Sequence, residues 1–171
     1  MKKSLIVLIF VVLFLLGLLF YNRPVTKTGF VTNMTVDRSE NPLFFYETIK
    51  YPNNVEIIPK ESTSARVGIV GDPWNLNFGI FQPGINGKRF LNLANYKEQP
   101  YHVKLISYGN ISPMISFSEN NFILYKGDEK KITVFLNSSL STESGNYTGE
   151  IDIISESTNI PFLGKILWGI K

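Results

Sequence analysis

Residues 130–137, Lys-Lys-Ile-Thr-Val-Phe-Leu-Asn, place apolar residues at alternate positions directly after the turn-forming pair Gly127-Asp128. Successive side chains of a strand point to opposite faces, so Ile132, Val134 and Leu136 would share one face of an extended segment. A face made of three branched aliphatic residues has to be buried against another layer. This stretch therefore predicts a half-buried β-strand.

The same alternation continues on both sides of this stretch, from Val67 onward. The other alternating sets are Leu76, Phe78 and Ile80, then Leu91 and Leu93, Val103 and Leu105, and Tyr147, Ile151 and Ile153. Turn-forming pairs such as Pro83-Gly84 and Asn86-Gly87 separate them. Seven or eight short strands at a spacing of roughly 8 to 12 residues, with no helical pattern between them, predict an all-β antiparallel β-sandwich over 66–171.

The end of the chain is expected to form the last strand, over 160–170. This segment is apolar on both faces, with Lys165 as its single charged residue. A second apolar face has to be covered by the preceding segment, by a membrane surface or by a partner. Leu163 and Leu167, on that second face, are therefore candidate interface residues, and the strand could bind by edge pairing.

Residues 22–65 are expected to form a connector or stalk with short strands. Prolines interrupt each potential long element of this segment, at Pro42, Pro52 and Pro59. The aromatic residues Phe44, Phe45 and Tyr46 lie between the first two prolines. Two interpretations remain open: these side chains pack onto the sandwich, or they form an exposed patch that binds a partner.

Several short motifs follow one another in a fixed order. They are Leu76-Asn77-Phe78-Gly79, Pro83-Gly84, Arg89 to Asn95, Ile115 to Ser118, Tyr125 to Glu129, and Gly145 to Ile151. Gly79 and Gly149 suit a bulge or a close backbone approach. Tyr147 has the position of a tyrosine corner, whose hydroxyl reaches back to the backbone.

The ordered series resembles the Ig-like sandwiches of prokaryotic, archaeal-type envelope proteins, which are related to the PapD-like, major-sperm-protein and ASH families. The resemblance covers about residues 67–171 and departs at Lys126-Gly127-Asp128, where the family usually has Pro-Gly-Glu. Gly127 should preserve that turn. The resemblance implies an Ig-like fold but no single function, because these modules serve as spacers, adhesins and docking domains.

The N-terminus has a different character. Ser4 to Tyr21 are 18 residues without a charge, 16 of them apolar, behind Lys2 and Lys3. As a helix this run would be about 27 Å long, close to the ~30 Å hydrocarbon core of a bilayer. We expect residues 4–21 to be one uncleaved N-terminal transmembrane helix that contacts the lipid bilayer, with residues 1–3 in the cytoplasm. A cleaved signal peptide and a processed pilin-type leader are alternatives, but neither processing site is evident in the sequence.

Four Asn-x-Ser/Thr sequons favour an extracytoplasmic location for the C-terminal domain of a single-pass cell-membrane protein. The candidate glycosylation sites are Asn33, Asn110, Asn137 and Asn146. About two sequons would arise by chance from the Asn, Ser and Thr content of the chain.

Charge and rare residues bear on function by exclusion. Without Lys2 and Lys3, the remainder of the chain is nearly neutral, which argues against binding of nucleic acid. There is no Cys, and His102 is the only His, so the chain lacks the ligands of a zinc site and the members of a nucleophilic triad. No nucleotide-binding loop is present, and the acidic residues are dispersed. We therefore expect no enzyme activity, no cofactor and no metal.

The expected function is a non-catalytic structural, adhesive or assembly role in the cell envelope, with a protein partner or a homo-oligomer. One alternative is an archaellin-like or pilin-like filament subunit, or a stator-like component of such a machine. A second alternative is an accessory binding domain for an enzyme or transporter encoded elsewhere. Partner identity is the main thing that the sequence leaves open.

Overall fold

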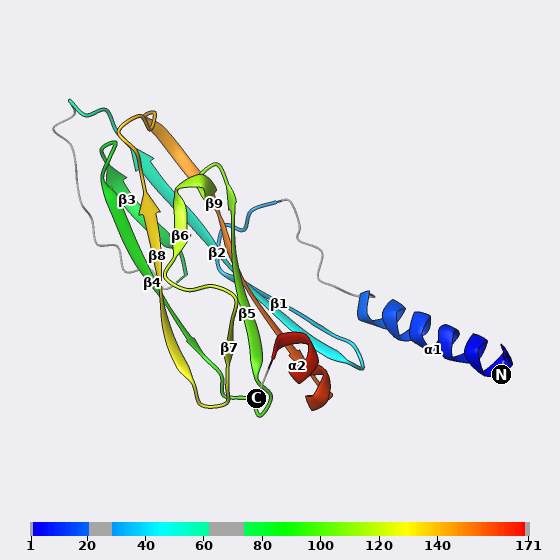
Figure 1. Cartoon of the computed structure of the whole chain (residues 1–171). Coiled ribbons are helices and arrows are strands. Elements are labelled where there is room, and N and C mark those ends of the chain that lie inside the picture. The colour runs from blue at the N-terminus through cyan, green and yellow to red at the C-terminus, as the bar shows by residue number, and fades with distance from the viewer. Residues whose placement is uncertain (1, 21–28, 62–73, 170–171) are drawn as a thin grey trace.

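The computed structural model describes residues 2–20, 29–61 and 74–169, and about half of them lie in β-strands (Figure 1). The helices are α1 (Lys2–Phe20) and α2 (Pro161–Trp168), and a short 3-10 helix covers Ser112–Met114. The strands are β1 (Thr35–Glu40), β2 (Phe44–Ile57), β3 (Leu76–Phe81), β4 (Asn86–Ala94), β5 (Tyr101–Gly109), β6 (Ile115–Phe117), β7 (Phe122–Leu124), β8 (Glu129–Asn137) and β9 (Gly145–Thr158).

The strands form two sheets, which confirms the predicted all-β sandwich. The large sheet has the order β1-β2-β9-β5-β7, with β3 paired to β2, and the small sheet has the order β4-β8-β6. All pairings are antiparallel except that of β3 with β2. Each alternating set of the sequence turns one face inward. The buried core unites Leu91, Ile132, Val134 and Leu136 of the small sheet with Val103, Leu105, Ile151 and Ile153 of the large sheet.

The segment expected to be a connector supplies a central strand of the sandwich. β2 pairs with β9 over its whole length, from Phe44 to Ile57, and these two strands run side by side along the long axis in Figure 1. The stalk expected over 22–65 is therefore wrong for β1 and β2. The expected boundaries of this stalk, between residues 21 and 22 and between residues 65 and 66, lie outside the described residues.

Pro52 does not interrupt β2, although prolines were expected to break long elements here. Pairing of β2 with β1 ends at Lys50, and pairing with β3 begins at Asn53. Beside Pro52, β2 is therefore paired on one side only, with β9. A proline has no N–H to donate, and it is tolerated where one side of a strand has no ladder.

The strand expected over 160–170 is also wrong, because its described part, up to residue 169, forms the helix α2. Pro161 cannot extend the hydrogen-bond ladder of β9, and its fixed φ suits the first turn of a helix. Gly169 ends the helix in the left-handed conformation, with φ of 65°, and its N–H donates to the Lys165 carbonyl. A short run that is apolar throughout fits either period, so alternation alone could not decide between helix and strand.

Three local predictions about the sandwich are confirmed. Gly79, with φ of 96°, lies where the pairing of β3 with β2 shifts register, which is a bulge. A Cβ on Gly149 would collide with the carbonyl oxygen of Tyr108 on β5. The Tyr147 hydroxyl donates a hydrogen bond of 2.9 Å to the carbonyl of Glu143, four residues upstream.

α1 spans Lys2–Phe20, close to the limits of the apolar helix expected over 4–21, of which residue 21 lies outside the described residues. Its described side chains, from Ile6 to Gly17, are all exposed. Within the described part of the chain, no helix meets the length and apolarity needed to span a membrane.

Candidate functional site

A groove opens between the two sheets at the end where β4 runs into β5. It has a volume of about 640 Å³. The large sheet contributes Glu47, Ile49, Tyr101, Val103, Leu124, Ile153 and Ser155, and the small sheet contributes Asn92, Leu93, Ala94, Glu129, Lys130 and Lys131, with Tyr96 beyond the end of β4. The floor is thus largely aliphatic and the rim is charged.

The groove arises because the two sheets differ in length and width. β2 and β9 have 14 residues each, whereas β4 and β8 have nine each. The three strands of the small sheet therefore leave part of the inner face of the large sheet uncovered. Ile49 and Leu93, which would be fully buried in a closed sandwich, are only partly buried here.

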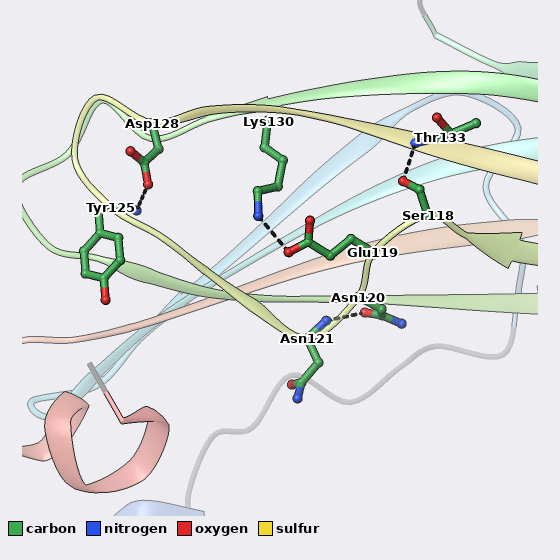
Figure 2. Close-up of polar contacts among 8 residues, drawn as sticks. All are labelled: Ser118, Glu119, Asn120, Asn121, Tyr125, Asp128, Lys130 and Thr133. Atoms are coloured by element: carbon green, nitrogen blue, oxygen red, sulfur yellow. Dashed lines mark hydrogen bonds and ion pairs between the residues drawn. The ribbon is translucent and has the colours of Figure 1, made fainter. Parts of the chain in front are cut away.

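Polar contacts hold the rim of the groove in place. Figure 2 shows Lys130 reaching Glu119, whose carboxylate lies 2.8 Å from Lys130 Nζ. The Lys130 ammonium also lies 4.2 Å from the centroid of the Phe122 ring. The Tyr96 hydroxyl, also on the rim, donates to Glu129 at 3.3 Å. The rim therefore carries both signs of charge.

The turn Tyr125–Asp128, also drawn in Figure 2, forms this end of the small sheet. The N–H of Asp128 donates to the Tyr125 carbonyl, and the Asp128 carboxylate accepts from the Tyr125 N–H at 2.8 Å. Gly127 has a φ of 81°, which a type II turn requires at its third position. The turn expected at Lys126-Gly127-Asp128 is therefore confirmed, and Gly127 is the residue that permits it.

A free strand edge lies beside the groove. Among the described residues, β4 pairs with β8 alone, so its other edge presents backbone N–H and C=O groups without a strand partner. Asn92, Leu93 and Ala94, at the end of β4, also line the groove. An extended segment added at this edge would continue the small sheet and direct every second side chain into the groove.

A second notable site is a buried charge cluster on the outer face of the large sheet. Glu150 and Asp152 of β9 are each 1% exposed, and Lys50 of β2 is 5% exposed. Lys50 Nζ lies 4.0 Å from the Glu150 carboxylate and 3.4 Å from the carboxylate of Asp37 on β1. Glu150 also accepts a 2.7 Å hydrogen bond from the backbone N–H of Val31. The cluster thereby ties the segment before β1 to the sheet.

The environment of Asp152 opposes its ionisation. Burial raises the pKa of Asp152 from its ordinary 3.8 to about 7, aided by the hydrogen bond and the negative charge of Glu150 and opposed by Lys50. One Asp152 oxygen is buried without a hydrogen-bond partner. Neither Glu150 nor Asp152 lines the groove, so a substrate in the groove would not reach them. Among the residues placed in the structure, no group of three or more His, Cys, Asp and Glu side chains could hold a metal ion.

The candidate interface residues of the sequence are not brought together into one exposed patch. Phe44 and Tyr46 are buried, and the half-buried Phe45 packs against the core beneath Lys97, whose Nζ is 3.9 Å from its ring centroid. Packing onto the sandwich is therefore the correct interpretation of this aromatic run. On α2, Leu163 is half-buried and Leu167 is exposed.

The four sequon asparagines, Asn33, Asn110, Asn137 and Asn146, are all exposed. Asn137 donates to Ser116 at 2.9 Å, and Asn110 accepts from the Thr148 N–H at 2.7 Å. Exposure makes each of them accessible, and the hydrogen bonds order two of the four side chains.

His102 has a structural environment. Its ring stacks on Trp168 of α2, with centroids 5.5 Å apart and planes 12° apart. Its Nε2 is 2.7 Å from the Asn121 side-chain oxygen. These contacts hold α2 against the sheet beside Phe44, whose ring meets Trp168 edge-on at 6.2 Å.

Sequence reasoning did not find the groove or the charge cluster. The groove leaves no local signal, because it depends on how far strands distant in sequence extend past one another. The cluster has a partial signal, because Glu150 and Asp152 are two residues apart in a strand and so share one face, but nothing near them in the sequence indicates that this face is covered. In comparisons with known proteins, no family model, no curated protein and no solved structure matches the chain.

Proposed function

We propose that this protein is a non-catalytic binding module of the cell envelope, anchored in the membrane, which holds an extended segment of a partner protein. In this proposal the partner segment pairs with the free edge of β4 and fills the groove with alternate side chains. The β-sandwich is the rigid frame, and the envelope role is structural, adhesive or one of assembly.

The groove beside β4 is the observation that carries this proposal. A volume of about 640 Å³ over an aliphatic floor is enough for several side chains. In the part of the chain that the structure describes, the edge of β4 next to the groove has no strand partner, which favours an extended polypeptide over a compact ligand because a strand satisfies the backbone groups. The two signs of charge on the rim favour a polypeptide with both charges over a polyanion.

The positions of the ionisable side chains support a non-catalytic role in this proposal. The Glu150 and Asp152 carboxylates lie on the outer face of the large sheet, under the chain at Val31, and do not face the groove. The His102 ring stacks on Trp168, and its Nε2 lies within hydrogen-bond distance of the Asn121 side-chain oxygen.

Anchoring and location are supported by the sequence. The 18 uncharged residues of Ser4 to Tyr21 follow two lysines, as in a helix inserted with its N-terminus in the cytoplasm. The exposure of all four sequon asparagines is compatible with an extracytoplasmic, glycosylated domain. The same proposal includes the resemblance of this domain to the Ig-like sandwiches of envelope proteins. The ordered motifs and the tyrosine corner at Tyr147 support it.

Site-specific photo-crosslinking in native membranes tests this function. A benzoylphenylalanine replaces Tyr96, which is 79% exposed at the groove rim, or Leu140, which is 80% exposed in the turn after β8 at the opposite end of the sandwich. We expect a discrete adduct from position 96 and none from position 140. Leu93→Arg, which places a charge in the groove, should abolish the adduct, provided that the variant keeps its melting temperature.

Equal adducts from positions 96 and 140, or an adduct at 96 that survives Leu93→Arg, would show that the groove is not the binding site. The mass of the adduct identifies the partner class. An adduct of two copies of this chain would indicate self-assembly, as in a filament subunit. A heavier or lighter adduct would indicate a different protein.

A further inference from the structure

The helix α2 presents apolar side chains to solvent on the side away from the sheet. Phe162 is 59% exposed and Ile166 is 70% exposed, and the neighbouring Leu167 is also exposed. On the opposite side of the helix, Gly164 is buried. Trp168 contacts His102 and Phe44. Trp168 is half-buried and lies at the border between these two sides.

The charge on α2 is of one sign. Lys165, exposed between Phe162 and Ile166, is its only charged residue, and the helix contains no acidic residue. A lysine stem can lie along an apolar surface while its ammonium reaches the polar headgroups. Exposed Phe and Leu with Lys and a border Trp are the composition of a helix that lies in a membrane interface.

We propose that α2 rests on the surface of the bilayer, with Phe162, Ile166 and Leu167 in the interfacial region and Lys165 among anionic headgroups. This inference depends on the membrane anchor proposed above. A lipid surface is the favoured occupant because it needs only apolar area and positive charge. On α2 the exposed apolar side chains stand beside a single positive charge, and a bilayer with anionic headgroups complements both.

The length of the chain is compatible with this placement. Ten residues, 21–30, separate Phe20 of α1 from Val31, so the eleven steps of about 3.5 Å between the two Cα atoms span no more than about 40 Å. Val31 is tied to Glu150, and β9 continues from there for eight residues, about 26 Å, to Thr158 just before α2. α2 therefore lies within reach of the membrane in which α1 would be inserted.

Fluorescence quenching in lipid nanodiscs tests the proposal on the full chain. The discs contain equal parts of phosphatidylcholine and phosphatidylglycerol, either plain or with acyl chains brominated near the headgroup. Trp74→Phe leaves Trp168 as the single tryptophan. We expect weaker Trp168 emission in brominated discs than in plain discs. The double variant Phe162→Gln with Ile166→Gln should lose this difference, whereas Leu140→Gln, at an equally exposed position far from α2, should keep it.

The outcomes separate this inference from the proposed function. If the chain is incorporated into the discs but Trp168 is not quenched, α2 does not contact lipid, and the anchor and the groove are unaffected. If quenching persists in the double variant with an unchanged melting temperature, the exposed apolar side chains are not what binds. If the chain fails to enter the discs at all, the anchor is wrong and this inference falls with it.

Discussion

Replacement of Asp152 by Asn should make the protein more stable at neutral pH. Asp152 and Glu150 are both buried, and among the described residues the ammonium group that pairs with this cluster is that of Lys50. Burial, together with Glu150, raises the pKa of Asp152 to about 7. Asn has a similar size and remains neutral at every pH, so the variant removes the cost of ionising a second buried carboxylate.

The sign and the size of the effect follow from proton linkage. Below about pH 3, Asp152 is protonated in both the folded and the unfolded protein, and its contribution is constant. As the pH rises toward 7, the unfolded chain releases the proton while the folded protein keeps it, so the free energy of unfolding falls. A rise in pKa from 3.8 to about 7, at about 1.36 kcal/mol for each pKa unit, corresponds to a loss of at most about 4 kcal/mol by pH 8.

Urea unfolding between pH 4 and pH 8, followed by tryptophan fluorescence, measures this difference. The unaltered protein should lose about 2 to 4 kcal/mol more between these pH values than Asp152→Asn does. Glu56→Gln, which removes an exposed carboxylate from the neighbouring strand β2, is the matched control and should leave the profile unchanged. Parallel profiles for the unaltered protein and Asp152→Asn would refute the reasoning, because the pKa of Asp152 would then be the same in the folded and the unfolded chain.

Two further predictions concern the frame of the sandwich. Gly149→Ala should lower the free energy of unfolding by more than about 2 kcal/mol, because the new Cβ would strike the Tyr108 carbonyl and lie 2.8 Å from the Ile111 methyl group. Gly29→Ala, where a Cβ meets nothing within 4 Å, is its control, and equal effects of the two would contradict the close approach of β5 and β9. Tyr147→Phe should cost about 1 kcal/mol through loss of the hydrogen bond to the Glu143 carbonyl. Thermal unfolding measures both, and an unchanged melting temperature in Tyr147→Phe would show that the corner does not stabilise the fold.

Local patterns were sufficient for most strands of the sandwich. β4, β5 and β8 each bury alternate residues, and the turn at Gly127 and the hydroxyl contact of Tyr147 are local as well. Each depends on residues within a few positions of one another. Such features can be inferred from spacing alone.

The errors arose where a distant neighbour decides the outcome. Pro52 is tolerated in β2 because of where β1 and β3 stop, which no feature near Pro52 indicates. The apolar run after Thr158 becomes a helix because Pro161 ends the ladder and Trp168 then packs on His102 and Phe44.

By itself, the sequence determined the β-sandwich class, the apolar N-terminal segment and the exclusion of cysteine chemistry, because each depends on composition or on a period of two. Only the tertiary structure decided that residues 44–57 belong to the sandwich, that Glu150 and Asp152 are buried beside Lys50, and that a groove lies next to the edge of β4. The physical reason is that strand pairing and burial join residues far apart in the chain. Val31 and Glu150, which share a hydrogen bond across 119 positions, are the plainest case.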